Sequence, residues 1–328
     1  MNSRYKTDTL DASRGNCHAA ATFILFSYNQ ENFVREAVRS ALNQQDVLLE
    51  IIVTDDCSTD RTFEILGKEV SDYRGPHLVH LRQNPKNLGL ISHINKVIFM
   101  AQNDIVIVAA GDDVSLPFRA RKIVEVFEKE APLFVHSRAA AIDASGNDLN
   151  LCKPSKTALH GKTSTKLIAG RTSNHLGATA AWHLDLFRKY GPIRFPDASE
   201  DGVLEFRAAL ERRVAFIDDV LVKYRVDEER TKYRPLNRLN REQSLSRRLA
   251  AFNSKEAIFL HRIADLDSAP NHVKSRLKPI LVRAIRKLNC CREVHESGAV
   301  SVLWRHRRHP LVALSAVLKE FNFLRKIR

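Results

Sequence analysis

The sequence predicts an α/β fold with a mainly parallel sheet flanked by helices, followed by a basic helical C-terminal region. Short, uninterrupted apolar runs alternate with segments of helical periodicity from residue 22 to about residue 225. Such continuous apolar runs are typical of strands buried on both faces, as in parallel sheets covered by helices. Acidic residues directly follow several of these runs, at the edge of the sheet where ligands of such folds bind.

Four strand–helix units are predicted in the first half of the chain. Helices are indicated by apolar side chains spaced three and four residues apart, as at Val34, Ala37, Val38, Ala41 and Leu42. The predicted strands are Thr22–Phe26, Leu48–Thr54, His77–Leu81 and Ile105–Ala110, and the predicted helices are Glu31–Leu42, Thr62–Val70, Ile91–Met100 and Pro117–Lys129.

The second half of the chain is less regular. Asp143–Arg171 is rich in Gly, Ser, Lys and Thr, which predicts a long loop or hairpin region. Beyond Asp227 the pattern is helical and basic, and Pro235, Pro270, Pro279 and Pro310 are expected to mark the boundaries between its helices. The other predicted elements are the strands Phe134–Ile142, Val214–Ile217 and Val220–Arg225 and the helix Asp201–Glu211.

Composition excludes several classes of protein. The chain has 328 residues, 44% hydrophobic and 27% charged, which is typical of a globular protein rather than a disordered one. Its mean hydropathy is −0.28, and it has no apolar run long enough to span a membrane. The polar start, Met1–Gly15, lacks the apolar core of a secretory signal, so we expect a cytoplasmic protein. Five cysteines without a CxxC pair indicate reduced thiols.

The net charge of +14 is concentrated at one end. Residues 230–328 contain 23 Lys and Arg against 7 Asp and Glu, a net charge of +16, whereas residues 1–229 have a net charge of −2. The basic region predicts attraction to polyanions.

Three acidic pairs are the candidate functional residues: Asp55-Asp56, Asp112-Asp113 and Glu200-Asp201. The first two follow apolar strands, and the third opens a predicted helix. Each has a plainer explanation, because acids occur in ordinary loops and the helix dipole favours them in a first turn. A divalent cation such as Mg²⁺ or Mn²⁺ prefers one or two carboxylates plus substrate phosphates, so Asp112-Asp113 would suit a metal–diphosphate clamp. A carboxylate of Glu200-Asp201 could act as a general base.

Other motifs are weaker. Gly161-Lys162-Thr163 ends like a phosphate-binding loop, but Lys156 stands where its first glycine should be. The sequence has neither G-x-G-x-x-G nor HExxH. Trp182 is expected in the core, although stacking on an acceptor ring stays open.

Five motifs, in this order and spacing, resemble the family-2 glycosyltransferases over roughly Thr22–Asp227. They are Phe26-Ser27-Tyr28-Asn29, Asp55-Asp56-Cys57-Ser58-Thr59-Asp60, Asn84…Asn87-Leu88-Gly89…Asn95, Gly111-Asp112-Asp113 and Ser199-Glu200-Asp201. The resemblance implies a GT-A fold, which is Rossmann-like. It also implies inverting transfer of a sugar from a nucleotide donor, most simply a UDP-sugar, to a glycan or lipid-linked acceptor in surface polysaccharide synthesis.

The resemblance also implies roles for residues. A nucleotide-sugar pocket would be formed by Ser27, Tyr28, Asn29, Asp55, Asp56, Asn87, Gly89, Asn95 and Asp112. Asp112 and Asp113 would hold Mn²⁺ or Mg²⁺ on the diphosphate, and Asp201, with Glu200 beside it, would deprotonate the acceptor. The sequence departs from the family at Ala110, where many members have the first Asp of a DxD motif. It departs again at Asp227, where many have a histidine, and Asp227 would be a substitute metal ligand.

From this resemblance and the charge distribution we predict three parts of the chain: a flexible tail at 1–20, a GT-A domain at 21–229 and a basic helical region at 230–328. The alternative function is a catalytically inactive α/β domain whose basic region binds an anionic membrane or another polyanion; the altered DxD motif favours it. Residues 311–328 are amphipathic and either pack on the catalytic domain or make peripheral contact with an anionic membrane. Nucleic acid is not expected as a partner, because no known nucleic-acid-binding motif accompanies the basic charge.

Overall fold

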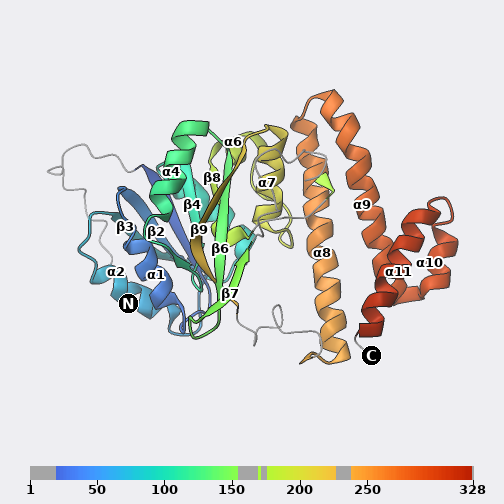
Figure 1. The fold of residues 1–328 in the computed structure, drawn as a ribbon, viewed down its shortest axis with the longest axis horizontal. Coiled ribbons are helices and arrows are strands. Elements are labelled where there is room, and N and C mark those ends of the chain that lie inside the picture. Colours follow the sequence, from blue (N-terminus) through green and yellow to red (C-terminus); the bar gives the residue numbers. More distant parts are fainter. Residues whose placement is uncertain (1–19, 154–168, 171–175, 227–237, 327–328) are drawn as a thin grey trace.

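The computed structural model describes residues 20–153, 169–170, 176–226 and 238–326. A central sheet with helices on both faces forms one end of the molecule, and a set of helices forms the other (Figure 1). The predicted α/β class with a helical C-terminal region is therefore confirmed.

Four parallel strands form the first half of the sheet: β1 (Ala21–Ser27), β2 (Leu49–Asp55), β3 (Leu78–Gln83) and β4 (Ile105–Ala110). They lie in the order β3-β2-β1-β4, and every residue of β1 and β2 is buried. The register pairs Ser27 with Asp55 and Phe26 with Ala110. The residues that follow β1, β2 and β4 therefore emerge together at one edge of the sheet.

The second half of the sheet mixes strand directions, which the apolar runs did not reveal. It contains β5 (Val114–Ser115), β6 (Phe134–Ile142), β7 (Asp148–Lys153), β8 (Ala181–His183) and β9 (Val214–Arg225). Strand β9 runs parallel to β6, whereas β8 is antiparallel to both β4 and β6. The two short strands predicted after residue 213 are one strand, β9, whose pairing with β6 shifts register. The predicted hairpin region begins with β7, which pairs with β6.

Helices cover both faces of the sheet. Successive side chains of a strand point to opposite faces, so each strand contributes to both layers of helix packing. Phe23 and Leu25 of β1 pack with α1 (Val34–Leu42), α2 (Thr62–Ser71) and α4 (Arg119–Glu130). Ile24 and Phe26 pack with α3 (Leu90–Val97), α6 (Asp185–Tyr190) and α7 (Glu200–Leu210). A short 3₁₀ helix, Ile98–Met100, extends α3.

The C-terminal region consists of α8 (Arg241–Asp265), α9 (Asn271–Ser297), α10 (Ala299–Arg305) and α11 (Pro310–Lys326). A capping box starts α8: the Asn240 side chain accepts from the Gln243 amide, and the Gln243 side chain accepts from the Asn240 amide. Ala257 and Ile258 of α8 belong to the core beneath the sheet, while Phe252 and Phe259 belong to the core of the helical region. Helix α8 therefore packs against both the sheet domain and the C-terminal helices.

The prolines of the C-terminal region mark helix boundaries only in part. Pro270 directly precedes α9 and Pro310 is the first residue of α11, as predicted, but Pro279 lies inside α9. Pro235 lies outside the described residues. No helix in the described ranges combines the length and apolarity needed to cross a bilayer. The four described cysteines, Cys57, Cys152, Cys290 and Cys291, are unpaired thiols.

Candidate active site

A cavity of about 810 Å³ lies at the carboxyl ends of β1, β2 and β4. Each of the three acidic pairs contributes to its wall, so the side chains predicted to converge do so. The acidic residues in the wall are Asp56, Asp112, Asp113, Glu200 and Asp201. Apolar side chains, among them Phe26, Leu90, Ile94, Val108 and Trp182, form much of the rest.

The two acids after β2 have different environments. Asp55 is fully buried and outside the cavity wall; it accepts hydrogen bonds from the Ser58 amide (2.8 Å) and the Gln83 side chain (2.9 Å). Asp56 accepts from the Asn84 side chain (2.7 Å) and the Gly89 amide (2.9 Å), and it faces the cavity. Asp55 therefore shapes the loop, and Asp56 is the acid available to a ligand.

The loop after β1 is held against the loop after β2. The Asn29 side-chain oxygen accepts from the Thr59 amide (2.9 Å), and the Asn29 amide donates to the Ser58 hydroxyl (2.9 Å). Asn29 has a φ of 50°, which asparagine tolerates better than most residues. Ser27 and Tyr28 line the cavity, whereas Asn29 does not.

The segment before and within α3 forms another part of the wall. Asn87 and Gly89 line the cavity, and Gly89, with a φ of 77°, has a conformation that favours glycine. Asn95 lies outside the wall: its side chain bonds the amide and carbonyl of Ile193 (2.9 and 2.7 Å) and so ties α3 to the segment after α6. His93 lines the cavity although the sequence did not single it out. Burial lowers the pKa of His93 to about 4, so its imidazole is neutral at neutral pH.

Arg225 holds the Asp112-Asp113 turn in place. Its amide donates to the Asp113 carboxylate (2.8 Å), and its guanidinium donates to the Asp112 carbonyl (3.0 Å) and to the Asp143 carbonyl (3.0 Å). Burial, then the neighbouring charge of Asp112, raises the pKa of Asp113 to about 8. A cation placed beside Asp113 would favour its ionised form.

The first turn of α7 contains Glu200 and Asp201, both in the cavity wall. The Asp201 carboxylate accepts from the Gly202 amide (2.6 Å). Gly177 lies against this turn: a Cβ there would come within 2.6 Å of a Glu200 carboxylate oxygen. The buried Arg262 of α8 donates to the Gly202 carbonyl (3.1 Å). Helix α8 thus contacts the turn that bears the candidate base.

Comparison with known proteins assigns the family. The model described as Glycosyl transferase family 2 matches residues 22–190, just over half of the 328 residues. The chain belongs to glycosyl transferase family 2. One relative of this chain, the succinoglycan biosynthesis protein ExoO of Rhizobium meliloti (strain 1021), is 33% identical over 104 residues. That match covers 32% of this chain and 28% of ExoO, so the chain matches less than a third of that relative.

Two solved structures show the same fold as this family-2 chain. One is S. aureus TarS 1-349 in complex with UDP-GlcNAc, with a TM-score of 0.54 and 16% identity over 92% of this chain and 88% of that one. The other is the mannosyltransferase PcManGT of Pyrobaculum calidifontis in complex with GDP-Man and Mn²⁺, with a TM-score of 0.53 and 14% identity over 92% and 86%. The predicted GT-A fold is confirmed by these likenesses.

The candidate metal ligands of this family-2 chain suit a cation that is coordinated partly by the protein and partly by a substrate. Asp112 and Asp113 both face the cavity, and Asp227 lies outside the described residues. Within the described ranges no three His, Cys, Asp or Glu side chains are grouped to hold a metal. Mg²⁺ and Mn²⁺ bound with nucleotides commonly take one or two carboxylates and complete their shell with phosphates and water. The donor set therefore suits a metal–diphosphate clamp and not a metal site made of protein alone.

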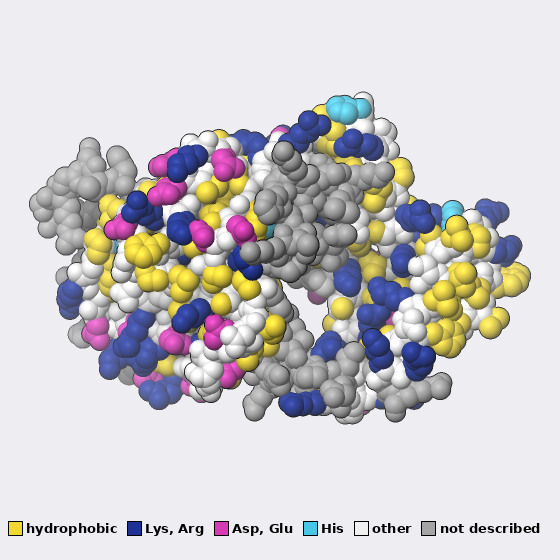
Figure 2. Space-filling model, viewed as in Figure 1, with side chains coloured by type: hydrophobic (Ala, Val, Ile, Leu, Met, Phe, Trp, Pro, Cys, Tyr) yellow, Lys and Arg dark blue, Asp and Glu magenta, His cyan; other side chains and the backbone are white. Residues whose placement is uncertain are grey.

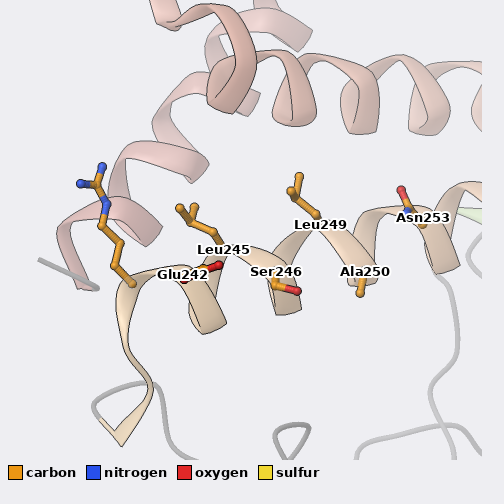
Figure 3. Close-up of a pocket in the computed structure, with 7 residues that line it drawn as sticks. Glu242, Leu245, Ser246, Leu249, Ala250 and Asn253 are labelled. Carbon is orange, nitrogen blue, oxygen red and sulfur yellow. The ribbon is translucent and has the colours of Figure 1, made fainter.

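A second hollow, of about 690 Å³, lies along α8 and has no such set of acids (Figure 3). All seven residues around it belong to α8: Arg241, Glu242, Leu245, Ser246, Leu249, Ala250 and Asn253. A single helix turns its side chains outward and cannot make them converge on a small ligand. The cavity at the sheet edge is therefore the better candidate active site.

Proposed function

We propose that this chain is an inverting glycosyltransferase. It would move a sugar from a nucleoside-diphosphate donor to a hydroxyl group of a glycan or lipid-linked acceptor in surface polysaccharide synthesis. The observation that supports this most is the single cavity whose wall contains Asp56, Asp112 and Asp201, from three segments far apart in the chain. ExoO, named for succinoglycan biosynthesis, supports the polysaccharide setting.

The donor would bind along the loops after β1 and β2. Asp56, held by the Asn84 side chain and the Gly89 amide, would accept from the base or ribose, and Ser27 and Tyr28 line the same space. In this proposal Asp55, Asn29 and Asn95 contribute by holding the loops. The TarS complex with UDP-GlcNAc makes a UDP-sugar the first donor to test, and the PcManGT complex makes a GDP-sugar the second.

A divalent cation, Mn²⁺ or Mg²⁺, would be held by Asp112, with Asp113 beside it, against the donor diphosphate. When bound, it stabilises negative charge that builds on the leaving phosphate oxygen. Arg225 keeps both acids at the cavity edge by bonding the main chain of Asp112 and the carboxylate of Asp113. The Mn²⁺ in the PcManGT complex supports the choice of metal.

Asp201 would be the general base. The acceptor oxygen attacks the anomeric carbon while the bond from that carbon to the diphosphate oxygen breaks, and the acceptor proton passes to the Asp201 carboxylate. One displacement through an oxocarbenium-like state inverts the anomeric carbon. Glu200, also in the cavity wall, would orient the acceptor or assist Asp201.

The test is Asp201→Asn, which keeps the size of the side chain but removes the base. We expect kcat to fall by about 10²- to 10⁴-fold while the affinity for UDP-sugars with Mn²⁺, measured by calorimetry, stays within about twofold. Asp197→Asn is the matched control, because Asp197 is an exposed acid on the same segment outside the cavity wall. Parent-like turnover by Asp201→Asn would rule out this base. Folded protein without turnover of any UDP-, GDP- or dTDP-sugar would instead favour an inactive domain, the reading that Ala110 supports.

A further inference from the structure

Helix α11 is apolar on two opposite faces. Its inward face contains small side chains, Ala313, Ala316 and Val317, which are buried in the core of the helical region. Its outward face contains larger ones, exposed by 74% (Leu311), 46% (Leu314), 56% (Leu318) and 55% (Phe321). The inward face is already packed against the core, so folding of the described residues does not explain the outward leucines and phenylalanine.

Helix α10 extends this exposed face. Val300, Leu303 and Trp304 are spaced three and four residues apart, which places them on one side of the helix, and they are 81%, 38% and 69% exposed. Figure 2 shows hydrophobic side chains gathered over this end of the molecule, with Lys and Arg side chains beside them. We call Val300, Leu303, Trp304, Leu311, Leu314, Leu318 and Phe321 the C-terminal apolar surface. Contiguous exposed apolar surface of this kind usually marks a docking site.

The charges around this surface are almost all positive. Its exposed basic side chains are Arg305, Arg307, Arg308, Lys319, Arg325 and Lys326. The one acid between residues 299 and 326, Glu320, is fully buried. The Arg307 guanidinium lies 4.4 Å from the centre of the Trp304 ring, and Arg305 has a long ion pair with Glu293 (3.5 Å). Tryptophan and arginine side by side are typical of surfaces that meet the head groups of a bilayer.

We propose that the C-terminal apolar surface docks on an anionic lipid bilayer, lying in the interface without crossing it. The apolar side chains would enter the head-group boundary, and the surrounding Lys and Arg would contact acidic lipid heads. A second copy of the chain is a poorer partner, because residues 230–328 carry a net charge of +16 and two such regions repel each other. An anionic bilayer supplies the opposite charge.

The test is sedimentation of the full chain with phosphatidylcholine vesicles that either contain or lack phosphatidylglycerol. We expect binding to the anionic vesicles and a loss of about tenfold or more in partitioning for Trp304→Ser/Leu311→Ser. Leu151→Ser is the matched control, because Leu151 is 55% exposed on β7, away from this surface, and should bind like the parent. No donor is present in this assay, so its outcome is independent of the proposed catalysis.

A second variant tests the charges. Arg308→Gln/Lys319→Gln should weaken partitioning by roughly tenfold or more, and raising the salt concentration should weaken the parent likewise. Unchanged far-UV circular dichroism and melting temperature would show that the variants are folded. Parent-like vesicle binding by Trp304→Ser/Leu311→Ser would overturn the proposal. So would absence of binding by the parent, or a parent dimer in solution that this substitution dissociates without any vesicle binding.

Discussion

Gly177 limits the space around the carboxylates of the first turn of α7. A Cβ at this position would lie 2.6 Å from a Glu200 carboxylate oxygen and 3.6 Å from the Asp201 Cβ. The Glu200 oxygen is the end of a flexible side chain, so an alanine can be accommodated if that carboxylate moves. We therefore expect Gly177→Ala to displace the Glu200 carboxylate, a candidate catalytic group, while the free energy of unfolding stays nearly unchanged.

We therefore predict that Gly177→Ala lowers kcat by roughly ten- to a hundredfold, because small displacements of reacting groups are costly. The affinity for the donor should change little, and steady-state kinetics with a saturating donor measures both. Gly67→Ala in α2 is the control: its Cβ would meet only a Leu81 methyl at 3.9 Å, so turnover should be unchanged. Equal rates for Gly177→Ala and the parent would mean that Glu200 and Asp201 do not need their present positions.

Individual site residues were predictable where the signal was local. Asp56 and Asp112 were predicted at one sheet edge because each acid follows an apolar strand. Asp201 was a candidate because it opens a predicted helix and because of the family resemblance, and all three line the same cavity. Arg225 and His93 were missed, because their roles depend on partners 39 to 113 residues away, such as Thr54 and Asp112. Contacts of that kind leave no periodicity in the sequence.

At the scale of elements, long segments were predicted well and short ones poorly. The strand Ile105–Ala110 and the strand Phe134–Ile142 have the predicted bounds, since long apolar runs give a clear signal. Strand β8 has three residues and helix α6 has six, too few for a period to be visible, and both were missed. The region predicted as a long loop or hairpin, Asp143–Arg171, contains strand β7. Residues 154–168 and 171–175 lie outside the described residues.

Helix α8 contributes to the site although it lies outside the segment that matches the family. Arg262 is buried, donates to the carbonyl of Gly202 next to the candidate base, and has its guanidinium 5.1 Å from the Phe206 ring centre. Burial lowers the pKa of Arg262 to about 10, and the charges of Glu205, Asp201 and Asp265 oppose that shift. Arg262 is thus a positioning residue for the first turn of α7.

We predict that Arg262→Met lowers the free energy of unfolding by about 3–5 kcal/mol, because it removes one partner from a buried charged cluster. It should also lower kcat more than the loss of folded protein explains, with the donor KM nearly constant, and Arg262→Lys should recover part of both. Denaturant unfolding and kinetics on the folded fraction separate the two effects. Arg276→Met, at an exposed position of α9, should change stability by less than about 0.5 kcal/mol. If kcat per folded molecule equals that of the parent, Arg262 is only structural.

At the scale of the whole molecule, buried charges connect the C-terminal helices to one another. The carboxylate of Glu320 on α11 accepts from the Arg248 guanidinium on α8 (3.0 Å) and from His295 on α9 (3.0 Å). Burial alone would raise the pKa of Glu320, but the hydrogen bonds from His295 and Arg248 and the charge of Arg248 outweigh it and lower this pKa to about 2. Three helices therefore depend on one ionised carboxylate.

This dependence predicts how stability changes with pH. The pKa of Glu320 is lower in the folded chain, about 2, than the usual 4.5, so its ionised form stabilises the fold above about pH 4.5. That contribution, about 3 kcal/mol from the size of the shift, should be lost as the pH falls from about 4.5 towards 2. Glu320→Gln should therefore be less stable than the parent at pH 7, and the difference should shrink as the pH falls through this window. Urea unfolding at a series of pH values measures the difference, with Glu296→Gln, an exposed change on α9, as the control. A difference that stays constant with pH would mean that the ionisation of Glu320 does not hold these helices together.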